Sequence, residues 1–110
     1  MSSRRETSAA PAVHHPRIAW EGARAFVRAA SSPHYSEFAA LVLARLGSEA
    51  YGQLSDTRQR LQTALADTGG DRHASDTEAG KWRARLEDLI RTRPDLIQAV
   101  RDLTNEALEA

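Results

Sequence analysis

The chain has 110 residues, in which fifteen lysine and arginine side chains balance fifteen aspartate and glutamate side chains, and it contains no cysteine. A chain of this length is expected to form one domain with one small core, and the lack of thiols excludes disulfides, cysteine-ligated metal centres and cysteine nucleophiles. The zero net charge argues against a general polyanion binder, because such binding depends on clustered lysine and arginine.

Helix-forming residues dominate the composition. Twenty residues are alanine and eleven are leucine, whereas valine, isoleucine and phenylalanine together number nine. Because alanine and leucine favour helices while β-branched and aromatic residues favour strands, this balance predicts an all-α fold. We expect a compact bundle of four to five helices over residues 17–110. It is preceded by a disordered basic tail over residues 1–16, which carries Arg4 and Arg5 and has no apolar periodicity.

The first predicted helix, residues 17–30, is amphipathic and has a basic polar side. Its apolar residues recur at steps of three and four, so they share one side of a helix, which we interpret as core together with its tryptophan. These residues are Ala19, Trp20, Ala23, Phe26, Val27 and Ala30. The other side carries Arg17, Arg24 and Arg28, with Glu21 among them. That side is either a solvated outer face or a binding surface for an acidic protein, an anionic membrane or nucleic acid.

The second predicted helix, residues 33–46, follows a Ser-Ser-Pro turn and is apolar on nearly every side. Its main stripe includes Phe38 and Val42, and Leu41 and Leu43 flank that stripe. A helix of this kind is normally buried on several sides. We therefore place it either at the centre of the bundle or in a subunit interface.

The third predicted helix covers residues 48–66. Gly52 and the pair Ser55–Asp56 weaken it, so a break is conceivable at that point. The apolar stripe stays in phase across them, which favours one continuous helix.

The last two predicted helices are separated by a proline. Ser75 and Glu78 have the spacing of a capping box, so the fourth helix is expected to begin there and to run to about residue 92, with Trp82 on its core side. Pro94 ends this helix, because the residue before a proline is pushed out of helical geometry, and it opens a fifth helix.

No motif for catalysis or for a cofactor occurs in the chain. The nucleophile-elbow, phosphate-loop and dinucleotide-binding patterns are absent, as is the paired-histidine pattern for zinc. Asp71, His73 and Asp76 could converge near the Gly-Gly loop, but such residues are common in surface loops. We therefore predict no catalytic residue, no cofactor and no metal site.

No segment has the pattern of a membrane span or a secretion signal. The longest apolar run, residues 38–44, has seven residues, whereas a spanning helix needs about 20. Arg4 and Arg5 are followed by polar residues and not by an apolar region. The sequence predicts a cytoplasmic protein.

Two patterns resemble those of a group of small all-helical actinobacterial proteins with no established function. The first is Ala19-Trp20-Glu21 at the start of a helix. The second lies in the last third of the chain and comprises Trp82, Arg83, Arg85, Leu86, Asp88, Leu89, Ile90, Pro94, Leu96, Leu103, Glu106 and Ala107. The resemblance implies an all-helical fold, similar in style to helical adaptor modules of bacterial signalling and defence systems. It implies no site residues.

These observations predict a non-enzymatic helical adaptor module that associates with itself or docks on another protein. The candidate interaction residues are Phe38, Leu41, Val42 and Leu43, with the two tryptophans as core supports. Protein partners are expected ahead of membranes and nucleic acids.

The alternative is a binding module for anionic surfaces, membrane or nucleic acid, that uses Arg17, Arg24 and Arg28. Residues 1–34 carry five arginines and two glutamates, a net charge of +3, whereas residues 35–110 carry ten basic and thirteen acidic side chains, a net charge of −3. The contact expected first is therefore one between the basic N-terminal region and an acidic surface, of the same chain or of a neighbour.

Overall fold

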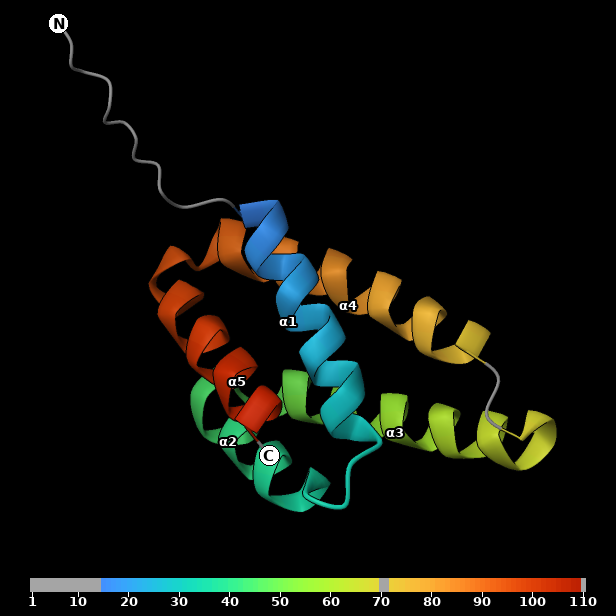
Figure 1. The fold of residues 1–110 in the computed structure, drawn as a ribbon. Helices are drawn as coiled ribbons and strands as arrows, with labels where there is room; N and C mark the ends of the chain where they lie inside the picture. The colour runs from blue at the N-terminus through green and yellow to red at the C-terminus, as the bar shows by residue number, and fades with distance from the viewer. Residues whose placement is uncertain (1–14, 70–71, 110) are drawn as a thin grey trace, which may run out of the picture.

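The computed structural model describes residues 15–69 and 72–109, and it confirms the all-α fold within them. A 3₁₀ turn, η2, covers Pro94–Leu96 just before the last helix. The α-helices are α1 (His15–Ala30), α2 (Tyr35–Leu46), α3 (Ser48–Thr68), α4 (Arg72–Thr92) and α5 (Ile97–Glu109). In Figure 1, α1 crosses in front of α4, and α5 lies to the left of α1.

The centre of the bundle is α1, and the prediction that the second helix would be central is wrong. The α1 helix packs against α3, α4 and α5, and half of its sixteen residues are buried. In α2 only Phe38, Ala39 and Val42 are buried. The bundle does not cover all of the apolar side chains of α2, because Ala40, Leu43 and Ala44 face outwards.

The first two helices begin at other residues than predicted, whereas the third agrees with the prediction of one continuous helix. The first helix begins at His15, with Pro16 in its first turn, where a proline costs no hydrogen bond; residues 1–14 of the predicted tail lie outside the described residues. The second helix begins two residues later than Pro33, after Ser32 Oγ accepts a hydrogen bond from the His34 N–H at 2.9 Å. The third helix is continuous, as predicted.

The predicted capping box at Ser75 and Glu78 is also wrong. The α4 helix begins at Arg72, so Ser75 lies inside its first turns and caps nothing. Glu78 is a buried residue that binds α3. Ser75 and Glu78 have the spacing of a capping box, but Glu78 serves a tertiary contact instead. The local sequence does not reveal that contact.

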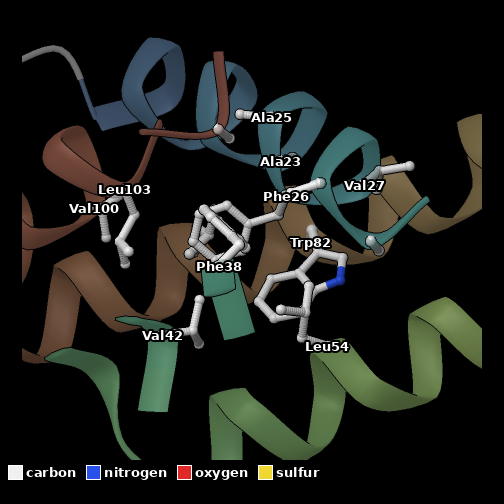
Figure 2. Close-up of a cluster of buried hydrophobic side chains, with 14 of the residues drawn as sticks. Ala23, Ala25, Phe26, Val27, Phe38, Val42, Leu54, Trp82, Val100 and Leu103 are labelled. Carbon is white, nitrogen blue, oxygen red and sulfur yellow. The ribbon is translucent and has the colours of Figure 1, made fainter. Parts of the chain in front are cut away.

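Three aromatic rings form the middle of the core. The Phe26 ring meets that of Phe38 edge-on at 5.2 Å between centroids and lies tilted on Trp82 at 5.1 Å. Figure 2 shows these rings together with Leu54 and Val42, which come from α3 and α2. Side chains from four helices thus meet around Phe26 of α1.

Gly22 lets α1 approach α4 and α5 closely. A Cβ atom at this position would stand 2.9 Å from Leu86 Cδ1 of α4, and 3.4 Å from atoms of Val100 and Thr104 of α5. A Cβ atom would therefore be too close to these neighbours. The three helices can meet here because Gly22 has no side chain. Small residues on the same side of α1 extend this close contact: Ala19, Ala23, Ala25 and Ala29 are all buried.

Replacing Gly22 with leucine is expected to lower the free energy of unfolding by about 1–3 kcal/mol, because the side chain overpacks the α1–α4–α5 contact. Gly52→Ala and Gly80→Ala are matched controls, since a Cβ at either position meets nothing within 4 Å. Each control should stabilise its helix by about 0.5–1 kcal/mol. Urea unfolding followed by circular dichroism measures the free energy of unfolding of all three variants. A Gly22→Leu variant as stable as the two controls would contradict the proposed close packing at Gly22.

Candidate interaction surface

The predicted apolar interaction patch on α2 does not exist as a continuous surface. Phe38 and Val42 are 5% and 0% exposed because they pack into the core against α1 and its neighbours. Leu41 is half-buried against the same core, and only Leu43, 45% exposed, faces outwards. Two of the four candidate residues therefore serve the fold, and they could reach a partner only if the helix moved.

The two tryptophans that the sequence assigns to the core differ in exposure in the structure. Trp82 is 1% exposed, which confirms its place in the core. Trp20 is 42% exposed, so its assignment to the core is wrong. The reason is the small-residue side of α1: Gly22 and its neighbouring alanines turn inwards, and Trp20 is left at the edge of the outer side.

Trp20 lies among arginines from two helices. The Arg24 guanidinium carbon is 4.9 Å from the centroid of the Trp20 ring, and that of Arg83, on α4, is 6.0 Å from it. Arg17, Trp20, Arg24 and Arg28 follow one another at three- and four-residue steps on α1, so they share one side of the helix. We call Arg17, Trp20, Arg24, Arg28 and Arg83 the arginine–tryptophan face.

The charges of this face are only partly neutralised. Arg17 lies 3.4 Å from Glu21, and Arg83 lies 3.0 Å from Glu87. Arg24 and Arg28 form no ion pair with any described residue. An open hollow of about 510 Å³ beside the ring is lined by Pro16, Arg17, Trp20, Glu21 and Arg24. The face thus combines unpaired positive charge with an exposed apolar ring.

A buried polar network joins α3 to α4 behind the aromatic core. The Trp82 indole N–H donates to Thr57 Oγ1 at 2.8 Å, and the Thr57 hydroxyl donates to Glu78 Oε1 at 3.0 Å. Arg60 donates twice to the same carboxylate, at 2.9 and 3.1 Å, and Lys81 donates once at 3.2 Å. The indole N–H of a buried tryptophan needs such a partner, and the sequence does not identify it.

Glu78 is held as an ionised carboxylate. Burial by itself would raise the pKa of Glu78, but the hydrogen bonds from Arg60, Thr57 and Lys81 and the charge of Arg60 outweigh burial and hold that pKa below the usual glutamate range. A general acid or base at neutral pH would need the opposite shift. The arrangement is that of a structural tie between two helices.

Three loop residues were considered for a metal site, and two of them lie in the described part of the chain. Asp71 lies outside the described residues, while His73 and Asp76 are exposed in the first turns of α4. Within the described part of the chain, no group of three or more histidine, aspartate and glutamate side chains could hold a metal ion. The same part of the chain contains no helix with the length and hydropathy of a membrane span.

Comparison of the chain with protein-family models, with curated proteins and with solved structures found no match. The two features of the molecule that bear on its function are therefore the arginine–tryptophan face and the buried network.

Glu78→Gln is expected to lower the free energy of unfolding by about 1–3 kcal/mol at neutral pH, because charge-assisted hydrogen bonds to Arg60 and Lys81 are lost. The pKa of Glu78 is lower in the folded state, so the ionised carboxylate stabilises the fold fully above the usual glutamate pKa. This contribution is lost as the pH falls through the lowered value.

Denaturant unfolding over a range of pH measures this difference, and the wild type and Glu78→Gln should converge at acid pH. Asp88→Asn is the control, because the Asp88–Arg91 pair is exposed on the surface and is worth little. An offset between wild type and Glu78→Gln that stays constant down to the lowest pH at which both proteins fold would contradict the assignment of the ionised tie.

Proposed function

We propose that this chain is a non-enzymatic helical interaction module and that its arginine–tryptophan face docks on an acidic surface of a second copy. The observation that carries the proposal is an exposed Trp20 flanked by the guanidinium groups of Arg24 and Arg83. Tryptophan and arginine are the residues most enriched among those that dominate binding energy at protein interfaces. Two arginine side chains hold the exposed Trp20 ring in place before binding. Burying this ring in an interface therefore loses little side-chain entropy.

A complementary acidic surface is available at the far end of α1. Glu37 of α2 and Glu106 and Glu109 of α5 line a hollow of about 270 Å³ whose floor includes Leu41 and Ala107. The last turn of α5 has no basic residue to offset the negative end of the helix dipole. A basic face from another copy would neutralise these carboxylates. The pairing is head-to-tail, because the two surfaces belong to different parts of the molecule.

The buried ionisable group supports a non-enzymatic role. Glu78 is the one glutamate or aspartate among the described residues that is buried, and the hydrogen bonds of the tie hold it ionised. It has no pKa near neutrality with which to exchange protons during a reaction.

The double variant Arg24→Glu/Arg28→Glu is expected to shift the association equilibrium towards monomer, because the face becomes acidic like its target. Sedimentation equilibrium or light scattering over a range of protein concentration measures the mass. Arg45→Glu/Arg101→Glu is the matched control, since it makes the same charge change at exposed positions on α2 and α5. It should associate like the wild type.

A charge-swap mixture tests the proposed pairing. Glu106→Arg/Glu109→Arg alone should also be monomeric, whereas an equal mixture with Arg24→Glu/Arg28→Glu should regain association, with the two variants present in equal amounts in the assembly. A wild type that stays monomeric at the highest soluble concentration would refute a second copy as the partner. Failure of the mixture, with an associating wild type, would refute the pairing of these two surfaces.

The second candidate function, binding to an anionic membrane or nucleic acid, uses the same side of α1. It is favoured by Arg24 and Arg28, whose charges have no ion-pair partner among the described residues. Such binding weakens steeply with salt. Retention of the wild type on anionic but not neutral liposomes, or a shift of DNA or RNA at low salt, both abolished by Arg24→Glu/Arg28→Glu, would favour this function over the first.

A further inference from the structure

A groove lies on the opposite side of α4 from the arginine–tryptophan face. Arg83 and Arg85 are two positions apart on this helix, so their side chains leave it on roughly opposite sides. The groove has a volume of about 260 Å³ and separates the start of α3 from the second half of α4. Its lining includes the apolar side chains of Leu46, Ala50, Trp82, Leu86 and Leu89.

Arg85 lines this groove with its hydrogen bonds incomplete. Its Nη1 atom is buried, and it is the one buried side-chain nitrogen or oxygen in the described residues that has no hydrogen-bond partner. The guanidinium carbon lies 5.2 Å from the centroid of the Trp82 ring, so one side of the group is covered by the indole. A buried N–H of a cationic group is costly to leave unbonded, which calls for a partner that residues 15–69 and 72–109 do not provide.

The carboxylates nearest in sequence are engaged elsewhere. Asp88 binds Arg91 at 2.9 Å, and Glu87 binds Arg83 at 3.0 Å on the other side of the helix. Glu49 also lines the groove, but no described carboxylate lies within ion-pair distance of Arg85. Asp88 lines the groove as well, and the remaining polar side chains of the lining, Gln53 and Thr92, carry no formal charge. Two carboxylates thus line the groove, but neither forms an ion pair with Arg85, so the positive charge of Arg85 has no counter-ion among the described residues.

We propose that this groove binds a small aliphatic carboxylate, whose carboxylate group accepts hydrogen bonds from Arg85. The planar guanidinium matches a carboxylate, which can accept two parallel hydrogen bonds from it. The aliphatic part lies against Leu46, Ala50 and Leu89, which form an apolar wall of matching chemistry. The groove suits a short or branched chain, because its volume is at the small end for ligand pockets. This inference is independent of the proposed self-association.

The test is a titration of the full-length ¹⁵N-labelled protein with 4-methylpentanoate, followed by the two indole N–H signals in NMR spectra. The Trp82 signal should shift and saturate, because its ring lines the groove, while the Trp20 signal stays in place. The neutral isostere 4-methyl-1-pentanol should give no saturable shift, since it cannot pair with a cation. Equal shifts with the alcohol, or shifts of both indoles in parallel, would overturn the proposal.

Arg85→Met should weaken binding by roughly tenfold or more, because it removes the charge-assisted hydrogen bonds. Arg83→Met is the matched control and should bind like the wild type. The Tm of Arg85→Met without ligand should change little, because the buried Nη1 atom that it removes has no hydrogen-bond partner and the methionine side chain can replace the guanidinium against the Trp82 ring. If Arg85→Met fails to fold, Arg85→Lys takes its place, since lysine keeps the charge but loses the planar pair of donors.

The variant Glu49→Gln tests whether Glu49 pairs with Arg85 in solution and so blocks the groove. If Arg85 is free in solution, this variant should bind 4-methylpentanoate as well as or better than the wild type, because one negative charge leaves the groove. Binding by Glu49→Gln with none by the wild type would show that Glu49 already occupies Arg85, and the proposal would fall. Wild-type affinity retained in the Arg85 variants would overturn it as well.

Discussion

The close approach of α1 to α4 and α5 is the constraint on which the rest of the structure depends. It is possible because Gly22 has no Cβ to strike Leu86 and because the buried residues around it are mostly alanines. With α1 this close to α4 and α5, Phe26 is the aromatic residue of α1 that lies in the core. The rings of Phe38 and Trp82 pack against it. The core is then assembled around α1, although α2 is the more apolar helix.

The same constraint creates the surface that we assign to binding. With its small residues turned inwards, α1 carries Trp20 on the outer side, where Arg24 and Arg83 hold the ring. A bulkier residue at Gly22 would move the helix away from α4, and Arg83 would then lie farther from Trp20. Packing on the inside of α1 and recognition on the outside are therefore parts of one arrangement.

Trp82 links the core to the two polar features of α4. Its ring lies in the aromatic cluster, its N–H reaches Thr57 and through it Glu78, and Arg85 stacks on its face. One of these polar groups is fully satisfied and the other is not. The carboxylate of Glu78 accepts hydrogen bonds from α3 and α4 and so ties the two helices together, whereas the buried nitrogen of Arg85 has no acceptor in the part of the chain that the structure describes. That contrast is why we assign structure to the first and ligand binding to the second.

The sequence by itself determined the helical class and the continuity of α3, and it predicted four to five helices, because alanine content, apolar periodicity and proline positions act locally. It also placed Arg17, Arg24 and Arg28 together on one side of a helix, since helical spacing alone decides which residues share a side. Only the tertiary structure decided that Phe38 and Val42 are core, that Trp20 is exposed and that Glu78 is no helix cap. The physical reason is that periodicity shows which residues share a side of a helix. Which side is buried depends on how closely another helix can approach, and here a glycine and its neighbouring alanines allowed the closest contact.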